Sequence, residues 1–362
     1  MSLQKIRSVG YNVPKPVRIW LAIGVFMVFM QVIIGGITRL TGSGLSITKW
    51  EIVTGTLPPL NVAEWQLEFE KYQGTPQYEK INQGMSMSDF KFIFFWEYFH
   101  RLWARTMGLV FIIPFFIFLR RGWLAKPLKR KLSVVVVMAA VVASFGWIMV
   151  ASGLIERPWV NAYKLTLHLS LALVLFGYLL WITFESFQPE KTLISNTRLK
   201  QFALVVTVTI CVQIVLGGLM SGMKAGMVYP TWPDMNGKVI PNEVFHSEMW
   251  EIKNFVNYDS SIYMPTLVQI LHRGVAYLLT GLILVFFIRA RKVKLELFKR
   301  STQLLITMLG IQFLLGVLTI IGCKGTIPVS LGSLHQGGAI ILLSIALFIN
   351  YQLSIKEVKM LK

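Results

Sequence analysis

Eight long apolar runs constrain this chain more than any other feature of its sequence. A helix needs about 20 residues to cross the roughly 30 Å hydrocarbon core of a bilayer. The runs lie near residues 19–37, 99–119, 132–152, 165–185, 201–220, 267–289, 302–321 and 330–351. With 54% hydrophobic and 15% charged residues, the composition is more apolar than a soluble domain of 362 residues requires. The sequence therefore predicts an all-α polytopic membrane protein with eight transmembrane helices.

The net charge of +19 comes largely from basic connections between these runs. Lys and Arg cluster at 120–131, at 289–300 and at both termini. These segments share one side of the membrane if the helices alternate, and the positive-inside rule makes that side cytoplasmic. We therefore expect both termini in the cytoplasm, contact with the lipid bilayer and no nucleic-acid partner. The first residues show neither a cleavable signal nor a transit peptide, which favours a bacterial cytoplasmic (inner) membrane.

An internal repeat divides the chain into two halves. Residues 31–59 align without gaps with residues 213–241, and later landmarks such as "FHRLW" and "LHRGV" also correspond. The coinciding residues are Gln31/Gln213, Gly35/Gly217, Gly36/Gly218, Gly44/Gly226, Trp50/Trp232, Gly55/Gly237 and Pro59/Pro241. The pattern predicts two tandem, pseudo-symmetric four-helix bundles, 1–195 and 196–362, related as parallel repeats.

Four of the five histidines occupy the even-numbered apolar runs, one in each, near the boundary expected to face outward. They are His100, His168, His272 and His335, and "LHLSLA" around His168 resembles "LHQGGA" around His335. Helix bundles hold cofactors between inward side chains of facing helices. Two facing imidazoles without a Cys or acid cluster fit axial ligation of haem iron better than a four-coordinate zinc site. Structural histidines or a proton relay are the alternatives.

An arginine follows the first histidine of each half, as His100-Arg101 and His272-Arg273. Haem propionates are carboxylates, and an arginine can bind a carboxylate through two hydrogen bonds. We expect Arg101 and Arg273 to contact haem propionates near the outer side of the membrane. The alternative is that both side chains reach to the membrane interface.

The halves differ three residues before that histidine, where the first has Glu97 and the second Gln269. Residues three apart share a helix face, so Glu97 can face the same cofactor edge as His100. The asymmetry predicts that one haem site carries an acid for chemistry while the other is a redox site. A pairing of Glu97 with Arg101, four residues away, is the structural alternative.

Longer motifs resemble one known family. The segments "GGITRLTGSGLSITKW" and "MSDFKFIFFWEYFHRLWARTMGLVF" in the first half, and "AGMVYPTWPDM", "QILHRGVAYLLTG" and "SLHQGGA" in the second, are similar to those of the haem A synthase family of bacteria and mitochondria. That family converts haem O into haem A for terminal oxidases by oxidising a ring methyl group to a formyl group.

The resemblance implies a role for each candidate residue. His100 and His168, with Arg101, would hold the substrate haem O in residues 1–195, where Glu97 matches the family's functional glutamate. His272 and His335, with Arg273, would bind a haem B cofactor in residues 196–362. Expected partners are an unidentified electron donor and haem O synthase, and a homo-oligomer is left open.

One departure concerns the two cysteines, Cys211 and Cys323. A branch of the family carries cysteine pairs in its outer loops, whereas this chain resembles the mitochondrial-like branch without them. Two other functions explain part of the pattern. A di-haem b-type protein passing electrons from quinol to an acceptor accounts for the histidines but not for Glu97. A transporter accounts for the parallel repeats alone. Arg105 and the long outer loops have no assigned role.

Overall fold

The computed structural model describes residues 5–7, 12–48, 57–154, 157–187, 190–192, 194, 196–246 and 250–354. Among these residues, eight helices are long and apolar enough to cross a membrane, which confirms the prediction of an all-α polytopic protein. They are α1 (Lys15–Leu40), α4 (Met87–Arg120), α5 (Lys126–Ala151), α6 (Ala162–Phe187), α7 (Thr197–Gly222), α9 (Tyr263–Ala290), α10 (Glu296–Ile321) and α11 (Val329–Leu353).

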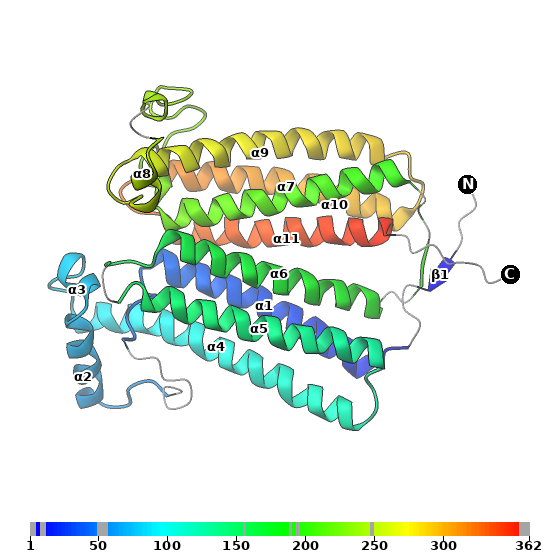
Figure 1. Cartoon of the computed structure of the whole chain (residues 1–362), viewed down its shortest axis with the longest axis horizontal. Helices are drawn as coiled ribbons and strands as arrows, with labels where there is room; N and C mark the ends of the chain where they lie inside the picture. The colour runs from blue at the N-terminus through cyan, green and yellow to red at the C-terminus, as the bar shows by residue number, and fades with distance from the viewer. Residues whose placement is uncertain are drawn as a thin grey trace.

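The eight helices form two groups of four (Figure 1). Helices α1, α4, α5 and α6 surround one hydrophobic core, which includes Trp20, Leu128 and Phe176. Helices α7, α9, α10 and α11 surround a second core, which includes Phe286 and Phe298. This grouping is consistent with two tandem bundles. The expected division of function between residues 1–195 and 196–362 stays a prediction.

The two groups meet through α1, α6, α7 and α11, and small residues bring these helices close together. A Cβ added to Gly222 of α7 would lie 2.7 Å from the Cβ of Ala162 on α6, and one added to Gly337 of α11 would lie 2.8 Å from Ile33. Glycine and alanine at such positions allow membrane helices to pack backbone against backbone. Arg39 also crosses this interface, donating to the backbone oxygen of Ser221 at 2.9 Å.

The two groups differ at their periphery. Helices α9 and α10 pack against each other, whereas their counterparts α4 and α5 make no comparable contact within the described residues. The apolar stretches of α4 and α5 are also the least buried of the eight. The first group is therefore more open on its lipid-facing side than the second.

Short elements mark the two ends of the helix array. Strands β1 (Lys5–Arg7) and β2 (Glu190–Thr192) pair antiparallel at the end where α11 finishes, which we name the terminal end (Figure 1). The opposite end, which we name the cap end, carries α2 (Val62–Gln73), α3 (Pro76–Lys80), η2 (Ala225–Met227), η3 (Asn242–Phe245) and α8 (Ile252–Val256). The β1–β2 pair was not predicted, because three-residue strands show no recognisable alternation.

Helix α4 begins at Met87, well before the apolar run that starts near residue 99. Its N-cap is Ser86, whose side chain accepts a hydrogen bond from the backbone N–H of Asp89. The added turns carry Phe90 and Phe94, which pack with Trp65 of α2. Hydropathy places this segment in a loop, whereas contact with α2 makes it helical.

Trp50 and Gly55 of the repeat lie outside the described residues.

Candidate functional site

The four histidines lie on α4, α6, α9 and α11, each in the half of its helix nearest the cap end. The ring centres of His272 and His335 are 6.4 Å apart, and their planes are inclined by 77°. His100 and His168 are close enough to interact electrostatically. The fold thus brings together the two pairs that the sequence predicted, one in each group of helices.

Glutamines that the sequence analysis treated only as repeat markers contact three of these histidines. The side-chain amide of Gln31 donates to Nε2 of His100 at 2.9 Å and to its backbone oxygen at 3.2 Å. Gln213 makes the same pair of contacts to His272, at 3.3 and 3.0 Å. Each amide joins a ring nitrogen to the backbone of the same histidine, so it fixes the ring relative to its helix.

Each imidazole also lies against a glycine of a neighbouring helix. A Cβ added to Gly35 would be 3.1 Å from His100, and one added to Gly217 would be 3.4 Å from His272. The corresponding distance is 2.9 Å both for Gly146 with His168 and for Gly316 with His335. These glycines provide the space that the imidazoles occupy. Any larger residue at Gly146 or Gly316 would displace the ring.

We expect Gly316→Ala to disturb the second pair through this contact alone. The new methyl group would overlap the His335 ring, which must shift, whereas Gly310→Ala on the same helix meets nothing within 4 Å. Alanine is favoured over glycine in helices by about 1 kcal/mol, so neither helix should unfold. Pigment bound by the purified protein would fall in Gly316→Ala and stay unchanged in Gly310→Ala. Equal pigment in both variants would contradict the assignment.

The spacing of the second pair is close to that of two imidazoles that share one haem iron. A metal–imidazole bond is about 2 Å long, which places a ring centre about 3 Å from the metal and two axial ring centres about 6 Å apart. The observed 6.4 Å agrees. The Nδ1 atom of His272 is buried without a hydrogen-bond partner among the described residues. Within those residues no group of three His, Cys, Asp or Glu side chains gathers around a possible metal ion.

Glu97 is buried, and both of its carboxylate oxygens accept hydrogen bonds. Its Oε2 accepts from the backbone N–H and hydroxyl of Ser46, at 2.7 and 2.8 Å, and from the N–H of Ile47 at 2.9 Å. Its Oε1 accepts from Arg101 at 2.6 Å. The ion pair weighed as the structural alternative is therefore present, and the same carboxylate also anchors the loop that follows α1.

Gln269 also holds a cap-end loop in the second half, but as a hydrogen-bond donor where Glu97 is an acceptor. Its amide donates to the backbone oxygen of Tyr229 at 2.8 Å, and Tyr229 aligns with Ile47 in the repeat. The acid accepts from a backbone N–H in one half, whereas the amide donates to a backbone oxygen in the other. The two halves therefore differ by a carboxylate at residue 97 and a neutral amide at residue 269.

Both candidate arginines hold cap-end loops in this structure. Arg101 donates to the backbone oxygen of Ile47 at 3.2 Å. Arg273 donates to the backbone oxygens of Thr231 at 2.6 Å, Asp234 at 2.8 Å and Tyr229 at 3.2 Å. Contact of either arginine with a haem propionate stays a prediction. Arg105, unassigned from sequence, lies near Arg101 on the same helix.

The loop anchored by Glu97 is also held from the side of α2 and α3. Gln77 donates to the backbone oxygen of Gly42 at 2.9 Å and accepts from the hydroxyl of Tyr72 at 3.1 Å. Burial raises the pKa of Tyr72 to about 12, so its hydroxyl stays protonated and able to donate. The long first loop, to which the sequence assigned no role, thus holds in place the segment after α1 that contacts Glu97.

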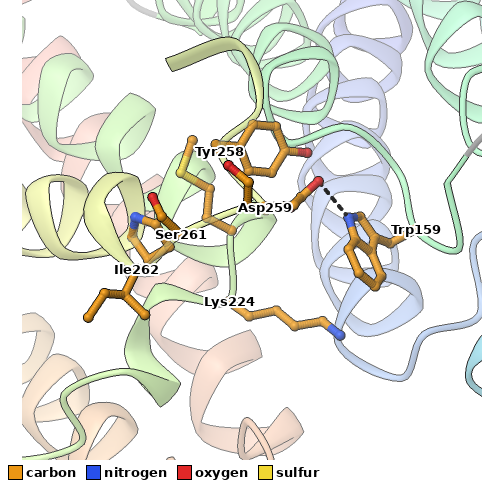
Figure 2. Close-up of a pocket in the computed structure, with 10 residues that line it drawn as sticks. Trp159, Lys224, Tyr258, Asp259, Ser261 and Ile262 are labelled. Carbon is orange, nitrogen blue, oxygen red and sulfur yellow. Dashed lines mark hydrogen bonds between the residues drawn. The ribbon is translucent and has the colours of Figure 1, made fainter. Parts of the chain in front are cut away.

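A cavity of about 380 Å³ opens at the cap end, between the start of α9 and the end of α7 (Figure 2). Asp259 accepts a hydrogen bond from the indole of Trp159 at 3.3 Å, and the Lys224 ammonium lies 5.4 Å from the centre of that indole. Burial, with Arg39 nearby, lowers the pKa of Lys224. None of the predicted site residues lines this cavity, so it is separate from both histidine pairs.

Sequence comparison identifies the family of this chain. The family described as "Cytochrome oxidase assembly protein" matches residues 18–347. A protein named Heme A synthase from Nitrosospira multiformis is 40% identical over 347 residues, covering 95% of each chain. The Heme A synthase of Flavobacterium johnsoniae is 39% identical over 344 residues, covering 94% of this chain and 98% of the relative. The chain therefore belongs to the cytochrome oxidase assembly protein family.

Proposed function

We propose that this chain is a membrane oxidoreductase that converts haem O into haem A, the prosthetic group of terminal oxidases. The single observation that carries the proposal is the near-full-length similarity to proteins named Heme A synthase. The two histidine pairs, one in each group of helices, supply the ligands that two haems require. The reaction oxidises a methyl group of the porphyrin ring to a formyl group.

The two haems have different roles in this proposal. His272 and His335 hold haem B as a resident cofactor, and haem B supplies one-electron redox chemistry when it is bound. His100 and His168 hold haem O, the substrate, between α4 and α6. The carboxylate of Glu97, where the second half has the amide of Gln269, supports this division, because the oxidation takes place at one haem and not at the other.

Glu97 is the residue to which we assign chemistry. Its carboxylate lies one helical turn from His100, on the same face of α4. A fixed negative charge stabilises positive charge that develops on the reacting substrate, and its orientation costs nothing at the moment of reaction. Ser46 and Arg101 hold this carboxylate in one orientation. We assign Arg101 and Arg273, which directly follow His100 and His272 in the chain, to the haem propionates.

The cap end faces away from the cytoplasm in this proposal. The basic connections at 120–131 and 289–300 adjoin the terminal end, where the positive-inside rule places the cytoplasm. The histidines then lie toward the outer side of a bacterial cytoplasmic membrane. Haem O synthase is the expected supplier of substrate, and a separate protein or quinol must act as electron donor.

Pigment analysis tests the function. Protein purified from cells that make haem O should contain haem B together with haem O, haem A or a hydroxylated intermediate, separable by reversed-phase chromatography. Haem O added in the presence of a reductant and oxygen should be converted into haem A. A pigment of haem B alone, with no conversion of added haem O, would instead identify a di-haem electron-transfer protein.

A further inference from the structure

The cap-end cavity has no part in the proposed function, although its volume of about 380 Å³ is in the range of pockets that hold small ligands. It lies where α7 ends at Gly222 and α9 begins at Tyr263, at the boundary of two membrane-spanning helices. Figure 2 shows the side chain of Lys224 extending along this cavity toward Trp159. The position is therefore one where a ligand from the membrane surface could enter.

Lys224 has a backbone conformation that lysine rarely adopts. Its φ of 52° and ψ of 32° are left-handed, and it follows directly after Met223, the C-cap of α7. Glycine is the usual residue at this position of a helix end, because it has no Cβ. The first half has glycine there, since Gly42 aligns with Lys224 in the repeat and has a φ of 70°. A side chain kept in an unfavourable backbone conformation points to a function for that side chain.

The Lys224 ammonium has no carboxylate within ion-pair distance among the described residues. The acid that lines the cavity, Asp259, is bound instead by Arg157 at 2.9 Å and by the indole of Trp159 at 3.3 Å. Lys224 contacts only the face of that indole, with its ammonium 5.4 Å from the centre of the ring. The cavity thus presents a positive charge without a neighbouring counter-charge in the part of the chain that the structure describes.

A second cation lies behind the same wall. Arg39 of α1 donates to the backbone oxygens of Ser221 and Gly222, at 2.9 and 3.1 Å, and Gly222 lines the cavity. The Nε atom of Arg39 is buried without a hydrogen-bond partner among the described residues. Arg39 is close enough to act electrostatically on Lys224. Two like charges at one wall repel each other, and an anion bound between them and the solvent would relieve that repulsion.

We infer that the cap-end cavity binds the phosphate group of an anionic phospholipid, with Lys224 as its main contact. Phospholipid phosphates lie at the depth where membrane-spanning helices end, and Trp and Tyr side chains are enriched there. Trp159 and Tyr258 supply such side chains to the cavity. The hydroxyl of Ser261 accepts from the N–H of Tyr263 at 3.4 Å, so its own proton can be donated to a phosphate oxygen.

Apolar side chains beside the cavity offer a surface for the acyl chains. Ile262 lines the cavity and is 51% exposed. Ile252 and Val256 lie on α8, the helix that leads into the lining residues, and are 80% and 60% exposed. Exposed apolar residues next to cations are typical of segments that lie in a membrane interface. A soluble phosphate compound would gain nothing from this surface, which favours a lipid as the source of the phosphate.

The experiment uses the full-length purified protein in detergent, supplied with phosphatidylglycerol, phosphatidylcholine or inorganic phosphate. Native mass spectrometry should detect a retained phosphatidylglycerol molecule, and less of the zwitterionic phosphatidylcholine. Lys224→Gly should bind phosphatidylglycerol roughly 10- to 100-fold more weakly, the effect of losing one charge-assisted hydrogen bond. Lys224→Arg keeps the charge and should retain the lipid.

Two controls separate lipid binding from a general effect on the fold or on charge. Lys224→Gly introduces the residue that the first half has at this position, so without lipid it should be at least as thermally stable as the unchanged protein. Weaker lipid binding by this variant would then not result from misfolding. Lys324→Gly removes an exposed lysine between α10 and α11 at the same end, outside the cavity, and should retain phosphatidylglycerol.

Retention of phosphatidylglycerol by Lys224→Gly at the level of Lys324→Gly would overturn the inference. Equal retention of phosphatidylcholine would also overturn it, because recognition would then not depend on net negative charge. Inorganic phosphate that binds as tightly as phosphatidylglycerol would overturn the assignment to a lipid and identify a soluble phosphate ligand. Haem content should be the same in both glycine variants, so failure of the proposed function would leave lipid retention unchanged.

Discussion

Protein carrying His335→Ala should be purified with little or no haem B, although it inserts into the membrane at the normal level. His335 contributes one of two imidazoles whose ring centres are 6.4 Å apart, and no other histidine of the described residues is placed to replace it. Without His335, only the imidazole of His272 would remain to hold the haem iron in this half. The loss would be measured as the ratio of haem B to protein, by pyridine haemochrome spectra and chromatography.

The control for this experiment is His246→Ala. His246 is exposed at the cap end and has no counterpart in the repeat, so its replacement should leave the haem B content unchanged. His272→Ala should reproduce the loss seen with His335→Ala. In contrast, His100→Ala and His168→Ala should retain haem B and lose bound haem O. If haem B instead disappears with the first pair, the two halves have been assigned in the wrong order.

Replacing Glu97 by glutamine should lower the rate of haem A formation about 10²- to 10³-fold, the effect typical of losing one fixed electrostatic contact to a transition state. The haem B content should not change, because Glu97 lies in the first group of helices. Product would be quantified by chromatography of extracted haems after a timed incubation with haem O. Glu185→Gln, which removes another acid that pairs with a lysine in the same group, is the matched control.

The same variant distinguishes chemistry from positioning. Glu97 also holds Ser46 and Ile47, so a purely structural role would loosen the loop and weaken substrate binding. That outcome raises KM for haem O and speeds hydrogen exchange of the two loop amides, with kcat preserved. A fall in kcat with slow exchange at these amides supports the chemical role. Activity equal to that of Glu185→Gln would remove Glu97 from the reaction.

The sequence predicted the membrane helices and the candidate ligands because both depend on local features. An apolar run of about 20 residues has few alternatives to spanning a bilayer, and His100 and His272 stand out in such runs. The early start of α4 was missed because Phe90 and Phe94 are stabilised by α2, a contact between segments far apart in the chain. No local pattern reports such packing.

The glutamines were missed for a different reason. Gln31 and Gln213 match each other in the repeat. Gln312, whose amide contacts His335, aligns with Val142, so the repeat does not mark it as a shared residue. The shared spacing of glutamine and glycine, repeated in three helices that carry no histidine of their own, was the available signal. Its meaning required the fold, which places each pair beside the imidazole of another helix.

The interface formed by α1, α6, α7 and α11 has a consequence for the origin of the two sites. A single four-helix chain could form the same interface with a second copy of itself, as a two-fold symmetric dimer. In such a dimer every substitution appears in both sites at once. In the tandem chain the two halves are separate stretches of sequence, so Glu97 in one can stand opposite Gln269 in the other. The two sites of the tandem chain can therefore differ in chemistry, whereas those of a symmetric dimer cannot.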